Sequence, residues 1–230
     1  MGRVKPENGS SNPYNEKLKP ILETAAKLIA EKGFDRASIR NLAQALNVSL
    51  ATIYYYFKGK EEILFLIQDS ALDNLLLSLR DRLSTSQDPL VKLYAFIHNH
   101  LTFALNYPNE HRVCTTEIDR LSGEFHQRVA EKRRLYFQMV SSIYAEVQEK
   151  YDLSSDDTRA QVLCLFGALN WVPTWYQSEK DGDVNTLTLH ILRVFTQGLS
   201  PAWDNRVSSL EELLMGISEQ RIFRLGESLY

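Results

Sequence analysis

Apolar residues recur at helical spacing along almost the whole chain, and this period limits the fold more than composition does. The clearest instance is the segment 16–32, which carries Leu18, Ile21, Leu22, Ala25, Leu28 and Ile29 and is followed by Gly33. Spacings of three and four positions place apolar side chains on one face of a helix. The sequence lacks the alternating pattern of half-buried strands bounded by hairpin turns. We therefore expect an all-α fold.

Residues 38–57 combine two short helical segments with a tight turn. Ser38 is a suitable N-cap for the first segment, Asn47-Val48-Ser49 forms the turn, and the second segment spans 50–57. Two helices of about two turns each, joined by a few residues that include one buried apolar side chain (Val48), are typical of a helix-turn-helix. The helix over 16–32 supplies a third wall, and Phe34 and Phe57 fill the small core. In such motifs the second helix enters the major groove of DNA.

Charge is distributed unevenly. The net charge is −3, yet residues 1–60 carry ten Lys and Arg against five Asp and Glu, whereas the remainder carries 16 against 24. A basic head on an acidic body suits a protein that docks one end on phosphates.

Several classes of protein are disfavoured. Cys114 and Cys164 match neither a disulfide framework nor a zinc spacing, and we expect two buried thiols. Five scattered histidines, with no Gly-rich phosphate loop and no nucleophile elbow, argue against catalytic residues, a metal site or a cofactor. The polar N-terminus lacks a signal core, and no run approaches the roughly 18 apolar residues of a membrane span. We expect a cytoplasmic protein that makes no membrane contact.

The chain divides into four parts. Residues 1–14 are expected to be a disordered arm, because Pro, Asn, Gly and Ser dominate. Residues 15–60 form the helix-turn-helix domain, and residues 61–200 form a helical bundle. Residues 201–230 form a C-terminal extension with one amphipathic helix. Prolines at positions 20, 89, 108, 173 and 201 mark helix boundaries, and the expected helices are 60–83, 88–106, 108–121, 122–150, 156–180 and 184–199.

The run from Ser38 to Phe57 resembles the DNA-binding signature of the TetR family. Residues 25–34 resemble the first helix of that family, and residues 58–64 continue the match. Asn47 stands where the family usually has Gly, but Asn tolerates the left-handed backbone that such a turn needs. The resemblance implies a DNA-binding transcriptional repressor that acts as a homodimer on a palindromic operator and responds to a small ligand bound in its helical domain.

The resemblance and side-chain chemistry together suggest the DNA contacts. Hydroxyls at the start of the second helix suit phosphates or base edges, small apolar side chains suit thymine methyls, and phenols and cations suit the backbone. Ile53 and Phe57 are expected in the core, while Tyr55 is open between core and surface. The expected DNA-binding residues are Ser38, Arg40, Ser49, Leu50, Ala51, Thr52, Tyr54, Tyr56 and Lys60.

The expected helices 156–180 and 184–199 resemble the pair through which the family dimerises. Two alternatives are open, because their apolar faces either meet a second subunit or close an internal core. The residues on these faces are Val162, Leu165, Phe166, Leu169, Leu187, Ile191, Val194 and Phe195.

Aromatic and polar residues share stripes on three bundle helices, which suggests a ligand cavity, although each stripe alone is more typical of a core. Residues 167–176 resemble a stretch of a TetR subgroup that regulates fatty-acid, branched-chain and steroid breakdown, and several members of that subgroup respond to acyl-CoA thioesters. Arg112, Glu117 and Arg133 resemble its middle helices. The alternative is a drug-like amphipathic effector, as in efflux control, whose pocket needs acids. The expected ligand-binding residues are Phe96, His100, Phe103, Tyr107, Arg112, Glu117, Arg133, Phe166, Asn170, Trp171 and Trp175.

Overall fold

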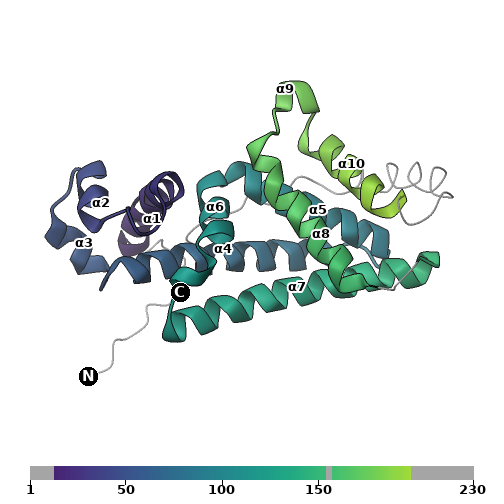
Figure 1. Cartoon of the computed structure of the whole chain (residues 1–230), viewed down its shortest axis with the longest axis horizontal. Helices are drawn as coiled ribbons and strands as arrows, with labels where there is room; N and C mark the ends of the chain where they lie inside the picture. Colours follow the sequence, from purple (N-terminus) through teal and green to yellow (C-terminus); the bar gives the residue numbers. More distant parts are fainter. Residues whose placement is uncertain (1–12, 154–156, 198–230) are drawn as a thin grey trace.

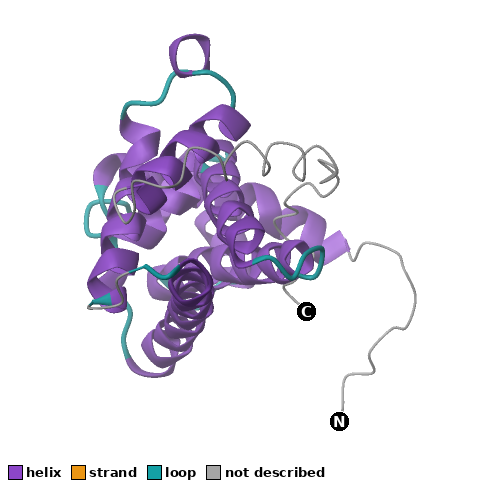
Figure 2. Cartoon of the chain, turned by 90° about the vertical axis from the view of Figure 1, so that its right-hand side faces the viewer, coloured by secondary structure: helices purple, strands orange, loops and turns teal. Residues whose placement is uncertain are grey.

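The computed structural model describes residues 13–153 and 157–197, and this part of the chain is helical and contains no strand (Figures 1 and 2). The all-α prediction is confirmed. None of the described helices combines the length and hydrophobicity that crossing a bilayer requires. The elements are α1 Pro13–Lys32, α2 Ile39–Ala45, α3 Leu50–Tyr56, α4 Lys60–Leu83, α5 Pro89–Asn106, α6 Pro108–Thr116, the 3-10 helix η1 Ile118–Arg120, α7 Gly123–Tyr151, α8 Thr158–Trp171, the 3-10 helix η2 Val172–Thr174, α9 Ser178–Asp181 and α10 Val184–Gln197.

The terminal predictions fall mostly outside the described residues. The expected arm lies there except for Pro13 and Tyr14, which already belong to α1. The C-terminal extension 201–230 lies there entirely.

Helices α1, α2 and α3 occupy one end of the elongated molecule, which we call the tip (Figure 1). Local side chains begin its two short helices as the sequence predicts. The Ser38 hydroxyl accepts a 3.1 Å bond from the Asn41 amide, and the Ser49 hydroxyl accepts a 3.1 Å bond from the Thr52 amide. Each cap satisfies an amide that the first helical turn leaves without a partner. Asn47 adopts the left-handed backbone, with φ of 54°, and so closes the turn.

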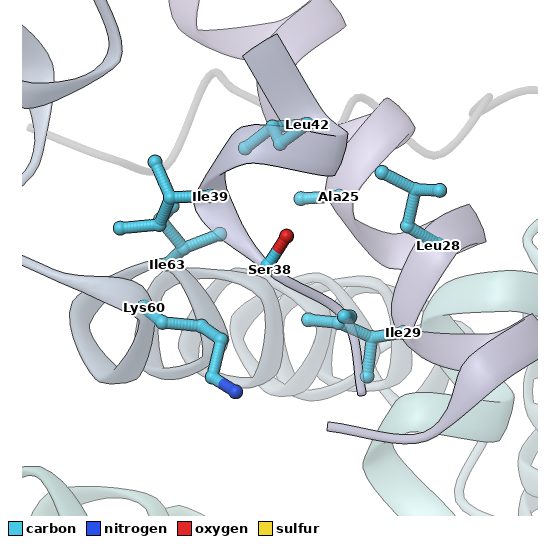
Figure 3. Close-up of a pocket in the computed structure, with 9 residues that line it drawn as sticks. Ala25, Leu28, Ile29, Ser38, Ile39, Leu42, Lys60 and Ile63 are labelled. Atoms are coloured by element: carbon cyan, nitrogen blue, oxygen red, sulfur yellow. The ribbon is translucent and has the colours of Figure 1, made fainter. Parts of the chain in front are cut away.

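The core of the tip continues into the rest of the molecule. Ala25 and Ile29 of α1, Leu42 of α2 and Ile63 of α4 lie together (Figure 3). The same apolar cluster extends to Val113 of α6 and to residues of α7. A three-helix core this small gains little from burial alone, so the long helices provide its support.

The remaining helices pack around a second apolar core. Helix α4 runs from the tip into the body, and α7 packs against it (Figure 1). Phe96, Phe103, Val140 and Leu165 are among the residues fully buried in this core. Because α4 is covered on most sides, it also buries polar residues, whose partners are described below.

Two expected helices are broken, and the reasons are local. The predicted helix 108–121 ends at Thr116, because Glu117 leaves helical geometry with φ of −107° and ψ of 37°. The predicted helix 156–180 ends at Trp171, and Pro173, which lacks an amide hydrogen, lies in η2. Pro20 was expected at a boundary but lies inside α1.

Two burial predictions, those for Val48 and Cys164, were wrong. Val48, expected to be the buried residue of the turn, is 38% exposed. Cys164 is exposed, whereas the Cys114 thiol is buried as predicted although the residue as a whole is half-buried. Of the predicted dimer faces, Val162, Leu165, Leu169 and Leu187 are buried within the subunit, so this part closes an internal core.

Candidate nucleic-acid interface and internal cavity

Helix α3 has one buried side and one exposed side. Ile53 is completely buried and Phe57 nearly so, which fixes the orientation of the helix on the tip. Of the predicted DNA-binding residues, Thr52 and Tyr56 are half-buried, and the exposed ones are Ser38, Arg40, Ser49, Leu50, Ala51 and Tyr54. The structure therefore leaves most of the predicted set exposed on the tip.

Tyr55 belongs to this surface and was left undecided by the sequence. It is 77% exposed, and its ring meets the Tyr56 ring edge-on at 5.1 Å. The helical rotation of about 100° per residue could have placed it, because a residue two positions after buried Ile53 lies on the opposite side.

The hydroxyls at the start of α3 already have structural partners. Ser49 Oγ lies 2.9 Å from Thr52 Oγ1 and also accepts from the Thr52 amide. The pair fixes the first turn of α3, so the side chains after it are held in defined positions on the exposed side.

Lys60 is half-buried at the start of α4. Its ammonium donates to the carbonyl oxygens of Phe34, at 2.7 Å, and Asp35, at 3.3 Å, and lies 4.2 Å from the centre of the Phe34 ring. Two of its three donors therefore bind the turn between α1 and α2. Lys60 therefore links α4 to this turn, and its contact with a DNA phosphate stays a prediction.

The bundle contains a cavity of about 350 Å³. Residues of α4, α5, α6, η1, α7 and α8 form its wall, and most of them are apolar or aromatic. Ile118 and Leu163 are partly exposed to solvent, so the cavity opens beside η1 and α8. The lining residues are Leu72, Leu75, His100, Phe103, His111, Cys114, Thr115, Ile118, Arg133, Tyr136, Phe137, Leu163, Phe166 and Asn170.

A polar cluster lies in this wall. Asn170 Oδ1 is 3.1 Å from His100 Nε2 and 3.2 Å from His111 Nε2, and Tyr136 OH is 3.4 Å from His100 Nδ1. Burial lowers the pKa of His100 to about 3 and also lowers that of His111, since the charged imidazolium loses its hydration. Both rings are therefore neutral at pH 7 and serve as hydrogen-bonding groups.

Arg133 is a cation in the wall of the cavity. Its Nη2 donates to the Cys114 carbonyl at 2.6 Å and to Gln68 Oε1 at 3.2 Å. Its Nε is buried and has no hydrogen-bond partner in the described structure. Burial lowers its pKa from the ordinary value, but a guanidinium remains charged at neutral pH. The cavity wall thus contains one positive group, whose Nε is buried in the wall without a partner.

Five of the eleven predicted ligand-binding residues line the cavity: His100, Phe103, Arg133, Phe166 and Asn170. Phe96 lies behind the wall, with its ring packed against three of the aromatic lining residues. The others do not line it: Glu117 follows the end of α6 and Trp175 follows η2, while Arg112 and Trp171 are exposed on α6 and α8 and Tyr107 precedes α6.

The sequence analysis missed several lining residues. His111, Cys114 and Thr115 share one side of α6, and their spacing of three and four positions was the available signal. Burial raises the pKa of the Cys114 thiol to about 12, so it stays protonated. Leu72, Leu75, Ile118 and Leu163 were also missed, whereas Tyr136 and Phe137 lie on one of the aromatic stripes that suggested the cavity.

Comparison with known families assigns both parts of the chain. The profile of bacterial regulatory proteins of the tetR family matches residues 21–67, and that of the tetracyclin repressor-like C-terminal domain matches residues 86–199. The chain belongs to the TetR family. Both profiles describe transcriptional regulators rather than enzymes, and the first covers the tip through the start of α4.

Individual proteins similar to this TetR-family regulator match it along most of their own length. The fatty acid metabolism regulator protein of Bacillus subtilis is 23% identical over 80% of this chain and 95% of its own. The structure of PfmR from Thermus thermophilus is 27% identical, with a TM-score of 0.69 over 78% of this chain and 98% of its own. AibR, solved with isovaleryl coenzyme A and operator DNA, is 19% identical, with a TM-score of 0.69 over 76% of this chain and 96% of its own.

Proposed function

We propose that this protein is a homodimeric repressor in the cytoplasm that binds a palindromic operator through α3 and leaves it when a small effector fills the cavity. The supporting observation is the combination, in one TetR-family chain, of an exposed α3 face at the tip and a lined cavity in the bundle.

The outward side of α3 suits major-groove recognition. Leu50 and Ala51 offer apolar surface to thymine methyls, and Tyr54 and Tyr55 offer phenolic hydroxyls to bases or phosphates. Arg40 is exposed on the neighbouring α2 and suits a flanking phosphate.

A dimer follows from the size of the tip and from the surface of α8 and α10. A single small helix-turn-helix buries too little DNA for tight specific binding, and a two-fold dimer presents two recognition helices about 34–36 Å apart. Among the described residues, exposed apolar side chains on these two helices include Leu163, Trp171 and Val194, which suit a subunit interface.

The lining of the cavity supports an acyl-type effector. None of its described lining residues is Asp or Glu, whereas Arg133 supplies a positive charge. A cationic drug needs the opposite arrangement. A volume of about 350 Å³ holds roughly a dozen non-hydrogen atoms at the density of liquid water, which suits an acyl group whose coenzyme A part stays outside. The relatives agree, since one regulates fatty acid metabolism and another was solved with isovaleryl coenzyme A.

Direct titration tests the effector proposal. Isovaleryl-CoA, palmitoyl-CoA, free CoA and the free acids are titrated into the full-length protein by calorimetry. Leu75→Trp fills the cavity, and Leu77→Trp, two positions away on an exposed side of α4, is the matched control. We expect one thioester to bind and Leu75→Trp alone to weaken it by tenfold or more. Binding of no thioester, or equal binding to both variants, would contradict the acyl proposal.

Footprinting on the DNA upstream of the protein's own gene tests the DNA-binding proposal. Ala51→Glu places a carboxylate on the exposed side of α3, while Gln138→Glu adds the same charge to an exposed position of α7. We expect a symmetric footprint that Ala51→Glu abolishes and Gln138→Glu preserves. Loss of the footprint in both variants, or in neither, would contradict the role assigned to α3.

A further inference from the structure

A chain of hydrogen bonds joins the cavity to the tip. It begins at Arg133 of α7, whose Nη2 donates to Gln68 Oε1 of α4. Gln68 Nε2 then donates to the main-chain carbonyl of Glu117 at 2.9 Å. The Glu117 side chain completes the chain, because its Oε1 accepts a 3.1 Å bond from the Phe34 amide in the turn between α1 and α2.

Both middle members of this chain are buried, so their partners matter. Gln68 is completely buried, and both ends of its rigid amide are satisfied by the two bonds just described. Glu117 is also buried and lies at the break between α6 and η1, where the backbone is not held in a regular helix. A buried polar group that loses its partner is costly, so a change at one end favours rearrangement of the next group.

Apart from its apolar packing, the turn at Phe34 has few other bonds to the body. Arg120 pairs with Asp35 at 3.0 Å, but both side chains are about half exposed or more, and solvent screens such a pair. Lys60 holds the Phe34 carbonyl from α4 itself. The hydrogen bond that the buried Glu117 carboxylate accepts from the Phe34 amide is therefore the main polar link between the η1 region and this turn.

Arg133 provides the point at which an effector can act. One nitrogen, Nη2, makes the bonds to both Gln68 and the Cys114 carbonyl, while the buried Nε has no partner. An oxygen acceptor on an effector in the cavity that turns the guanidinium plane disturbs both Nη2 bonds together, because the group is planar and rigid, and such a turn also gives the buried Nε a way to gain a partner.

We propose that the chain Arg133–Gln68–Glu117–Phe34 carries effector occupancy from the cavity to the DNA-binding tip, and that the effector acts through a carbonyl, carboxylate or phosphate oxygen placed against Arg133. This inference rests on the proposed function. In the empty protein the chain holds the turn after α1 against η1. An effector oxygen draws Arg133 from Gln68, the Glu117 carbonyl loses its donor, and the Glu117 carboxylate releases the Phe34 amide. The tip then rotates more freely, and the spacing of the two recognition helices is lost.

The first test needs neither DNA nor effector. Hydrogen exchange is followed in the peptide covering residues 30–37 of the full-length protein. Gln68→Met keeps the approximate shape of the side chain but removes both bonds. Ser70→Ala is the matched control, because Ser70 is buried on the same helix and bonds only to the carbonyls of Leu66 and Ile67. We expect exchange at Phe34 to accelerate by on the order of tenfold in Gln68→Met and to stay unchanged in Ser70→Ala. Equal exchange rates in the two variants would refute the proposed hydrogen-bond chain.

The second test measures coupling. Operator affinity is measured with and without saturating isovaleryl-CoA or palmitoyl-CoA, and thioester affinity is measured separately. Coupling is the factor by which the thioester lowers operator affinity, and in wild type we expect it to be about 5- to 150-fold. In Gln68→Met the thioester should still bind, but operator affinity should be nearly the same with and without it. Glu117→Gln, which keeps an oxygen acceptor for the Phe34 amide, should retain most of the coupling. Unchanged coupling in Gln68→Met would refute the proposal. If wild type binds neither thioester, the acyl-effector proposal fails, while the exchange result still decides whether the chain holds the tip.

Discussion

Replacement of Lys132 by Met should reveal how strongly α4 and α7 are held together. Asp69 of α4 is 2% exposed, and the Lys132 ammonium of α7 lies 2.6 Å from its carboxylate. Lys132 also lies 2.6 Å from the Asp73 carboxylate, and Arg128 Nη2 lies 3.1 Å from Asp69. The Arg128 side chain is largely exposed, so Lys132 is the better shielded partner of the buried charge.

The expected magnitude follows from this burial. Removing one partner of a buried ion pair costs about 3–5 kcal/mol, because the other charge stays buried without compensation. Since Arg128 remains beside Asp69, we expect Lys132→Met to lower the free energy of unfolding by about 2–3 kcal/mol. For a chain of this size that is a fall in Tm of about 4–12 °C. Protomer concentration is held fixed, because dimerisation shifts Tm.

The double variant Asp69→Leu with Lys132→Met is the decisive comparison. It removes the buried charge together with its partner, so it should be less destabilised than Lys132→Met alone. Urea unfolding followed by circular dichroism measures both variants. The reasoning is refuted if Lys132→Met lies within about 0.5 kcal/mol of wild type, or if the two substitutions simply add.

Three further predictions concern caps and cores. Burial raises the pKa of Asp88, but its bonds to Lys150 and to the first turn of α5 outweigh this and lower it. A lowered pKa contributes stability above the ordinary carboxyl value of about 3.9, and this is lost as pH falls through the folded value. The stability advantage of wild type over Asp88→Asn should therefore shrink on acidification in urea titrations, and a constant difference would contradict this. Ser49→Ala should cost about 1 kcal/mol in thermal unfolding, whereas Ser49→Asp should keep the cap but weaken operator binding; equal operator affinity would argue against a role near phosphates. Ile53→Ala should cost about 2–5 kcal/mol and Tyr55→Ala less than about 0.5 kcal/mol, and the reverse order would mean that α3 is turned the other way.

The tip was predictable because its determinants are local. Each determinant acts within a few residues of itself: the caps are Ser38 and Ser49, and the left-handed residue is Asn47. The boundaries of α2, the turn and α3 could therefore be predicted accurately. Val48 was misjudged because its exposure depends on how the turn faces the neighbouring helices rather than on its own apolar character.

The cavity was predictable only in part, because its membership depends on where helices end. Trp171 and Trp175 share a helical face only if the helix continues past Pro173, and the chain instead turns at η2. His111 looked unremarkable in sequence, yet the packing of α6 brings it to Asn170.

Glu117 shows a second limit of sequence reasoning. Its resemblance to residues of a ligand-responsive subgroup suggested a place in the ligand site. The end of α6 at Thr116 instead turns its carboxylate toward the Phe34 amide, where it joins the body to the tip. No periodic pattern could indicate a contact between residues 83 positions apart.

The central claim is that effector binding in the bundle releases DNA from the tip. The most direct measurement is fluorescence anisotropy of the footprinted operator DNA at fixed salt, with the protein titrated in the absence and presence of acyl-CoA thioesters. We expect tight binding that one chain-length class of thioester reverses, while free CoA and the free acid do not. Specific binding that no thioester alters would contradict the effector assignment, and the absence of specific binding would contradict the claim that this protein regulates transcription through α3.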